Sequence, residues 1–263
     1  MRVYLEVARR AYARQSTYRA ATVAGVFTNS VFGFLLAYVL LAVYSGRSEI
    51  NGFTAADAVT FTFVSQGLFF LSGNSDLEQA TRIGSGDVVI DLYRPIDYQG
   101  YWAAIDAGRS AYQLIFRGIP PFVVGWIAFD QVSLPPSAWL WPAFAVSVAL
   151  AVAVTSSFRF IVQSLAFWML EIRGPNQMAS LTAAFFAGSF VPLFLFPPAL
   201  LAVARVLPFI AILQWPVEIF LGAHTGADLA AVLAAQAAWA VALAGAGRWV
   251  LARATRKVVI QGG

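Results

Sequence analysis

Long blocks of apolar residues, separated by short polar segments, constrain this chain more than any other feature. Six blocks reach the length of about 20 residues that an α-helix needs to cross a bilayer. They are residues 20–44, 55–73, 112–130, 138–169, 178–200 and 229–250. Only 11% of the residues are charged, against about 25% in a soluble domain. The sequence therefore predicts an all-α polytopic membrane protein with six transmembrane helices, in a single domain over residues 1–263.

The distribution of basic residues predicts the orientation of these helices. With the N-terminus in the cytoplasm, all of the 17 Lys and Arg residues except Arg47 and Arg205 fall on the cytoplasmic side. Both termini are then cytoplasmic, and topology rather than nucleic-acid binding explains the net charge of +4. The first residues are Arg-rich and too polar for the core of a signal peptide, so we expect the N-terminus to be retained. We expect a multi-pass protein of the bacterial inner membrane.

Residues 1–18 have the pattern of a helix that lies on a membrane surface. At 100° per residue, Met1, Leu5 and Tyr12 fall on one arc and Arg2 and Arg9 on another. The alternative is a basic flank that only fixes the orientation.

A polar loop, residues 75–100, joins the second and third apolar blocks. A Gly84-Ser85-Gly86 break and a stop at Pro95 enclose a short amphipathic run. This arrangement predicts a turn, a short helix and a second turn on the cytoplasmic side, suited to insertion into a partner. The alternative is a solvated connector.

A proline-broken apolar segment, residues 196–226, separates the last two blocks. Backbone that breaks within a membrane must be covered by protein or line a wet cavity, so we read this segment as re-entrant and facing a pathway. An external loop dipping into the headgroups is the alternative. The residues expected to shape it are Pro197, Pro198, Pro208, Pro216 and Glu218.

Few ionisable residues lie near membrane depth. Arg159, in the fourth block, is expected to snorkel to the cytoplasmic phosphates in preference to contacting a substrate. Glu218 and His224 are expected to be solvated at the external surface, with attraction of a cationic substrate as the alternative. Aromatic residues could line an apolar pathway or face lipid, and the candidates are Phe27, Phe63, Phe186 and Phe190.

Several kinds of chemistry are excluded or disfavoured. The chain has no cysteine and one histidine, which removes disulfides, Cys-containing metal sites and haem ligation, so we expect no metal site and no catalytic residue. No Gly-x-x-x-x-Gly-Lys-Ser/Thr sequence is present, so any ATP hydrolysis must come from another chain. A secondary transporter and a membrane enzyme acting on lipids stay as alternative functions.

Several short strings, in this order and spacing, resemble ABC-2 type transporter permeases. They are Arg82-Ile83-Gly84-Ser85-Gly86-Asp87, the run from Asp91 to Asp97, Arg109, Arg117-Gly118-Ile119-Pro120-Pro121, Phe167-Trp168 and residues 258–263. The resemblance implies a permease subunit of an ABC exporter that binds no cofactor itself, while a cytoplasmic ABC ATPase in two copies binds ATP and Mg²⁺. It also implies a second permease half, identical or related, and contact with membrane lipid but not nucleic acid.

The resemblance further assigns roles to two segments. Residues 82–94 would form a coupling helix that sits in a groove of the ATPase, with charged contacts setting the register and Val88, Val89, Ile90 and Leu92 as the apolar anchor. Residues 196–226 would form two external re-entrant helices that gate the pathway. The exported substrate would be hydrophobic or amphipathic, with a cationic drug-like molecule as one candidate. The residues expected to couple to the ATPase are Arg82, Gly84, Gly86, Asp87, Val89, Asp91, Leu92, Arg94 and Pro95.

Overall fold

Helices make up nearly all of the regular structure in the computed structural model, which describes residues 1–72 and 76–261, with side chains through Arg256. The two strands described, β1 (Glu49–Ile50) and β2 (Phe53–Thr54), form one short antiparallel hairpin. The start of the predicted coupling loop at Ser75 and the final Gly262-Gly263 lie outside the described residues.

Within residues 1–72 and 76–261, four helices are long and apolar enough to cross a membrane. These are α2 (Arg19–Val43), α3 (Ala55–Ser72), α8 (Leu140–Ser164, extended by the 3-10 turn η2, Leu165–Phe167) and α12 (Gly226–Gln261). They coincide with the first, second, fourth and sixth predicted blocks. The chain is thus a helical membrane protein, as its composition predicts.

The third predicted block, 112–130, is the distal part of a longer helical rod. The rod consists of α6 (Tyr98–Gln113), a π-helical turn η1 (Leu114–Gly118) and α7 (Ile119–Ala128). It begins at Tyr98 because the Asp97 carboxylate caps it, accepting a hydrogen bond from the Gly100 amide at 2.7 Å. Pro120 and Pro121 lack the amide hydrogens that α-helical bonds to the preceding turn require, which accounts for the change to π geometry there. The predicted loop therefore ends before Tyr98 rather than at residue 100.

The prediction of one continuous helix over 178–200 is wrong. Helix α9 (Arg173–Phe186) ends early, and the chain then turns at Gly188, whose φ of +85° is costly for residues with a side chain. Pro192 interrupts the backbone before the 3-10 turn η3 (Leu193–Leu195). The block is apolar throughout, but these two residues prevent it from forming a single helix.

The predicted proline-broken segment is confirmed as broken. It contains α10 (Pro198–Arg205), the 3-10 turn η4 (Pro208–Ala211) and α11 (Gln214–Leu221). Pro198 and Pro208 each stand in the first turn of their helix, where no amide hydrogen is needed.

The loop between α3 and α6 holds two short helices instead of the single one predicted. They are α4 (Glu78–Gly84) and α5 (Val88–Tyr93). The predicted break separates them, and Gly86 takes a φ of +84° there. The preceding residues 78–84 form a helix because they pack against α8 and η2.

The N-terminal helix is confirmed as α1 (Arg2–Gln15). It packs along α6, and the two backbones come so close that a Cβ added to Gly108 would lie 2.1 Å from the Ala8 carbonyl oxygen. Ala11 is buried in this contact. Residues 1–18 are therefore more than a charged flank.

Burial is uneven among the long helices. In the most apolar 18-residue stretch of α3, 72% of the residues are buried, against 17% in α2 and in α12. The main core lies where α3 meets α8 and α11, and Phe61, Leu68, Val154, Leu213 and Val217 are among its buried residues. The faces of α2 and α12 are consequently free for lipid or another chain.

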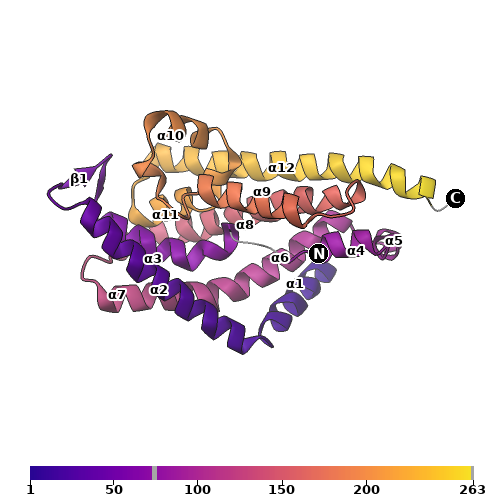
Figure 1. Cartoon of the computed structure of the whole chain (residues 1–263), viewed down its shortest axis with the longest axis horizontal. Helices are drawn as coiled ribbons and strands as arrows, with labels where there is room; N and C mark the ends of the chain where they lie inside the picture. The colour runs from indigo at the N-terminus through magenta and orange to yellow at the C-terminus, as the bar shows by residue number, and fades with distance from the viewer. Residues whose placement is uncertain (73–75, 262–263) are drawn as a thin grey trace.

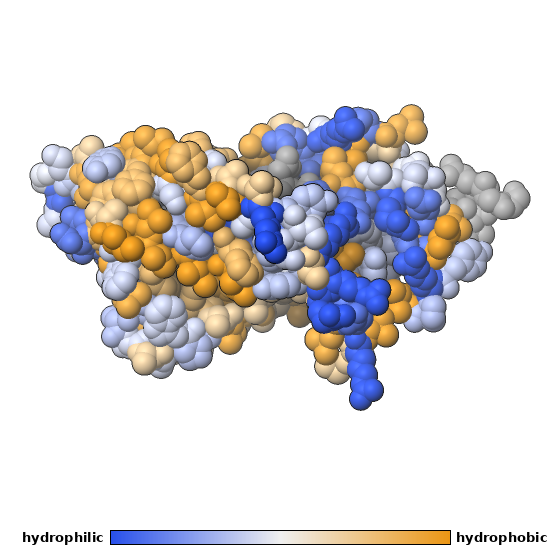
Figure 2. All heavy atoms as spheres, turned by 90° about the horizontal axis from the view of Figure 1, so that it is seen from below, coloured by the Kyte–Doolittle hydropathy of each residue, from blue (hydrophilic) through white to orange (hydrophobic). Residues whose placement is uncertain are grey.

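The two ends of the molecule differ in character. Figure 1 shows the C-terminus of α12 with α4 and α5 toward one end, and β1 and α10 toward the other. On the face seen in Figure 2, apolar side chains dominate one half, and blue hydrophilic residues gather over the other. The molecule therefore has an apolar portion and a charged end that holds the loop between α3 and α6.

Candidate functional site

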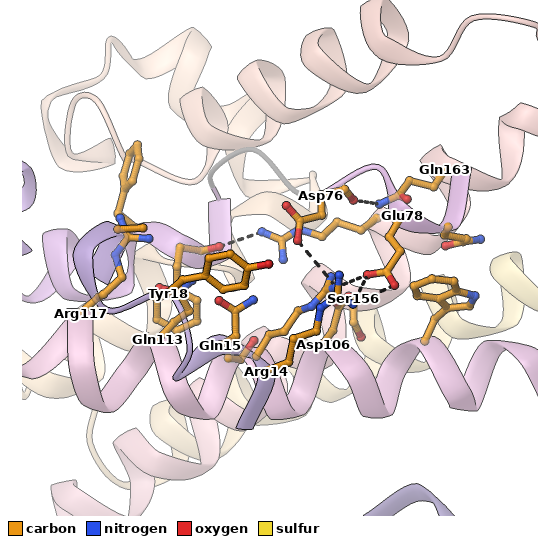
Figure 3. A pocket seen from close by; sticks show the side chains of 18 of the residues that line it. Arg14, Gln15, Tyr18, Asp76, Glu78, Asp106, Gln113, Arg117, Ser156 and Gln163 are labelled. Carbon is orange, nitrogen blue, oxygen red and sulfur yellow. Dashed lines mark hydrogen bonds and ion pairs between the residues drawn. The ribbon is translucent and has the colours of Figure 1, made fainter. Parts of the chain in front are cut away.

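Polar residues recur every three or four positions along one face of the α6 rod. Asp106, Arg109, Gln113 and Arg117 all line a cavity of about 670 Å³ that α1, α2, α3, α4 and α8 complete (Figure 3). This spacing is visible in the sequence, but the two arginines enter the sequence analysis as topology signals and as part of the family resemblance, and not as members of a polar cavity. This cavity was not predicted from the sequence.

Arg159 reaches into this cavity instead of toward lipid headgroups, so the prediction that it snorkels is wrong. Its Nη2 donates hydrogen bonds to the carbonyl oxygens of Phe70, at 2.8 Å, and Leu71, at 3.2 Å. These are among the last carbonyls of α3, which have no partner within that helix. Arg159 therefore fixes the end of α3 against α8.

Glu78, at the start of α4, joins the loop to the cavity wall. Its carboxylate accepts hydrogen bonds from Arg14 Nη1 of α1, at 2.9 and 3.0 Å, and pairs with Arg109 Nη2 of α6. Partial burial raises the pKa of Glu78, but the two guanidinium groups outweigh it, and the net pKa is below the ordinary value. The carboxylate is ionised and connects three helices.

Side-chain hydrogen bonds hold α4 from a further direction. Gln79 Nε2 donates to Ser164 Oγ at 3.1 Å, and the Ala80 amide donates to Gln163 Oε1 at 3.2 Å. Both acceptors belong to α8. Helix α4 is therefore held on α1, α6 and α8 at once.

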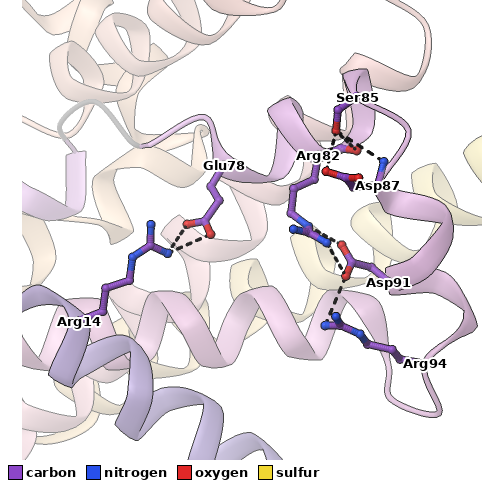
Figure 4. A network of polar contacts seen from close by, with 7 residues as sticks. All are labelled: Arg14, Glu78, Arg82, Ser85, Asp87, Asp91 and Arg94. Atoms are coloured by element: carbon purple, nitrogen blue, oxygen red, sulfur yellow. Dashed lines mark hydrogen bonds and ion pairs between the residues drawn. The ribbon is translucent and has the colours of Figure 1, made fainter.

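A buried carboxylate holds α5 onto α4. Asp91 is 3% exposed and accepts two hydrogen bonds from Arg82, from Nε at 2.6 Å and Nη2 at 2.9 Å, with Arg94 Nη1 at 3.3 Å (Figure 4). We call residues 78–95, with this internal pairing, the transmission element. The predicted residues Arg82, Asp91 and Arg94 are brought together, but Asp91 is turned inward and pairs within the chain.

The apolar residues of α5 divide between two faces. Val88 is 2% exposed, and Leu92 packs beside it against α6, so neither offers the outward anchor expected of them. Ile90 and Tyr93 are 60% and 86% exposed, and Val89 is 39% exposed. The outward apolar face therefore consists of Val89, Ile90 and Tyr93.

The remaining predicted residues of the loop shape this face. Asp87 is exposed and accepts a hydrogen bond from Ser85 Oγ at 3.0 Å. Gly84 ends α4, Gly86 makes the turn, and Pro95 follows the end of α5. These residues present α5 at the charged end of the molecule.

A second polar cluster lies at the opposite end, between α11 and α12. His224 Nε2 lies 2.9 Å from Glu218 Oε2, and its Nδ1 contacts an Asp228 carboxylate oxygen. Gln214 donates to Glu218 at 2.8 Å. The Glu218 side chain is only 15% exposed, so the expectation that it is solvated is wrong. The hydrogen bond to Glu218 is the largest cause that raises the pKa of His224, although burial opposes it.

The prolines predicted to form an external gate differ in their burial. Pro197 and Pro198 are exposed at the start of α10, Pro208 is half-buried, and Pro216 is buried within α11. Their contribution to a gate stays a prediction.

The four aromatic residues predicted for a pathway do not come together. Phe27 is 71% exposed on α2, and Phe190 is 44% exposed after α9. Phe63 is fully buried between Phe34 and Phe129, and Phe186 is partly buried against the core. Within one chain, Phe63 is a packing residue.

No group of three or more His, Cys, Asp or Glu residues in the described part of the chain is arranged to hold a metal ion.

Comparison with known proteins gives one family: residues 29–262 match the family model described as ABC-2 family transporter protein. No curated protein matches the chain.

Proposed function

The chain belongs to the ABC-2 transporter family, and we propose that it is the permease subunit of an ABC exporter of the bacterial inner membrane. Two copies of a cytoplasmic ATPase, which bind ATP and Mg²⁺, would drive it. A second permease half, identical or related, would complete the pathway. The cargo would be a hydrophobic or amphipathic molecule.

One observation carries this proposal beyond family membership: the transmission element presents an apolar face with a charged border. Ile90 and Tyr93 are exposed at the charged end of the molecule, with Asp87 and Arg94 beside them. Exposed aromatic and aliphatic side chains ringed by charge are typical of a docking surface, in which apolar residues give affinity and charges give register.

The contacts of the transmission element support a mechanical role. A push on α5 would pass to α4 through Asp91, and from α4 to α1 and α6 through Glu78. Closure of the ATPase dimer on binding ATP would therefore tilt the α6 rod and open the pathway outward. Rigid elements joined by charged contacts that break and re-form are a common means of such coupling.

The proposed topology has six passes with both termini in the cytoplasm. Helix α9 with the following turn would make the fifth pass, and the α6 rod the third. The short helices α10 and α11 would be the external re-entrant gate, because short broken helices need cover from protein at membrane depth. The weakly buried face of α2 would meet lipid or the second permease half.

The test is purification of the tagged chain from its native membranes in mild detergent, followed by mass spectrometry and an ATPase assay of the eluate. We expect an ABC ATPase to co-elute, and Tyr93→Glu to lower its amount by about 30-fold, as loss of a central aromatic anchor does. The matched control is Val206→Glu, which puts the same charge at a 70% exposed apolar position on the opposite end. A chain that elutes without an ATPase, or a Tyr93→Glu variant that keeps it, would contradict the proposal.

A further inference from the structure

Arg117 is an unusual residue for the middle of a helical rod in a membrane protein. It lies in the π turn η1, and its guanidinium fills the space that a Cβ on Gly25 of α2 would occupy. It makes no hydrogen bond or ion pair with any residue in 1–72 or 76–261, and its Nε is buried without a partner. Arg117 as a whole is half-buried, and an ionisable side chain near membrane depth without a protein partner marks a candidate ligand site.

The other three arginines around the cavity are already engaged. Four arginines and three carboxylates line it. Arg14 and Arg109 share Glu78, Arg109 also lies 3.7 Å from Asp76, and Arg159 bonds to the carbonyls of α3. Among these four arginines, Arg117 alone has neither a hydrogen bond nor an ion pair with the described residues, and with all seven side chains ionised the cavity carries one excess positive charge.

The surroundings of Arg117 suit a headgroup attached to an apolar body. Gln113 lies one helical turn away, and its Oε1 is buried without a partner among the described residues. In the view of Figure 3, Arg117 and Gln113 lie toward one side of the cavity, and Glu78 and Gln163 toward the other, with Tyr18 between them. Phe69 and Phe70 line the same cavity. Its volume, about 670 Å³, is in the range of small-molecule sites.

We propose that this cavity binds the anionic group, a phosphate or a carboxylate, of an amphipathic molecule, with Arg117 as its counter-ion and Gln113 and Tyr18 as hydrogen-bonding partners. A guanidinium and a phosphate or carboxylate match in geometry as well as in charge. A cationic amphiphile would meet uncompensated positive charge there. That the bound molecule is the exported cargo rests on the proposed export function. That the cavity binds an anionic amphiphile does not depend on that function.

Binding is tested on the purified chain alone in dodecyl maltoside, by thermal unfolding with rising concentrations of decyl phosphate. Decyltrimethylammonium, with the same tail, is the opposite-charge probe, and inorganic phosphate tests the headgroup without a tail. We expect decyl phosphate to raise the unfolding midpoint saturably in the wild type. Arg117→Gln should weaken this binding at least about tenfold, while Arg117→Lys keeps most of it. Arg173→Gln is the control, because Arg173 is 82% exposed.

Without ligand, Arg117→Gln should unfold no lower than the wild type, since it removes an unpaired charge. If that variant does not fold, Gln113→Leu and Tyr18→Phe take its place and should weaken binding several-fold. The proposal is overturned if both decyl amphiphiles act alike, or if the cavity variants bind decyl phosphate as the wild type does.

The anionic group could belong to a bilayer lipid or to the exported molecule. Phosphatidylglycerol that displaces decyl phosphate, without stimulating the ATPase of the assembled complex, would identify a resident lipid. Decyl phosphate that stimulates ATP hydrolysis in phosphatidylglycerol membranes would identify cargo. The binding assay contains no ATPase, so its result would hold even if the export proposal proved wrong.

Discussion

Replacing Asp91 by asparagine removes the charge that joins α5 to α4, while keeping the size of the side chain. Asp91 is 3% exposed and pairs with Arg82 and Arg94. Breaking a fully buried ion pair costs about 3–5 kcal/mol. Because Arg82 and Arg94 are 32% and 47% exposed, their guanidinium groups regain water when the pairing is lost. We therefore expect a cost of about 2 kcal/mol.

This cost should appear as local opening and not as global unfolding, because the long helices do not depend on Asp91. At about 2 kcal/mol, the backbone amides of α5 should exchange with deuterium roughly 30-fold faster in Asp91→Asn. Exchange is measured by mass spectrometry at a pH where opening is at equilibrium. Amides in α8 should be unaffected, which separates local from global effects.

Asp87→Asn is the matched control, since Asp87 is in the same loop but exposed, and accepts only the Ser85 hydroxyl among side chains. Its effect should stay within about twofold, as for an ordinary surface substitution. The reasoning is refuted if Asp91→Asn exchanges no faster than Asp87→Asn.

Two further predictions concern other contacts. The pKa of His224 is raised in the folded protein, so protonation of His224 stabilises the fold below about pH 6.5, and this stability is lost as the pH rises through the raised pKa. The unfolding midpoint of the wild type should therefore fall over that pH range. A His224→Gln variant that shows the same fall would disprove the assignment. Gly108→Ala should separate α1 from α6, because the new Cβ would lie 2.1 Å from the Ala8 carbonyl oxygen. We expect the free energy of unfolding to fall by about 1–3 kcal/mol and the amides of α1 to exchange faster. Gly245→Ala is the control that should not destabilise the protein, because a Cβ at Gly245 meets nothing within 4 Å.

The sequence was sufficient to predict the helices that are apolar along most of their length. Helices α2, α3, α8 and α12 match predicted blocks because hydropathy alone defines them. It failed at 178–200, where average hydropathy concealed Gly188 and Pro192, and it missed residues 98–111 of the α6 rod, which are helical but polar. Hydropathy reports what can be buried in lipid, whereas helix ends depend on caps and breaks.

The site was only partly predictable for a different reason. A sequence shows that Asp91 is charged, but not that Arg82 and Arg94 approach it, because inward and outward faces of a six-residue helix differ by one or two positions. The cavity combines Arg14 of α1, Glu78 of α4, Arg117 of η1 and Arg159 of α8. No local pattern joins residues so distant, although the polar spacing from Asp106 to Arg117 indicated that one face of that helix was not meant for lipid.

Glu78 connects the two parts of the site. It belongs to the transmission element, yet its carboxylate neutralises Arg14 and Arg109 in the cavity wall. Movement of α4 away from α1 and α6 would leave Arg14 without a counter-ion and Arg109 with Asp76 alone, so the positive charge facing a bound anion would rise. Movement in the opposite direction would restore the pairing and leave Arg117 as the excess charge. If the cavity binds an anionic group as proposed, the position of α4 would therefore change its affinity, because Arg14 and Arg109 share the Glu78 carboxylate.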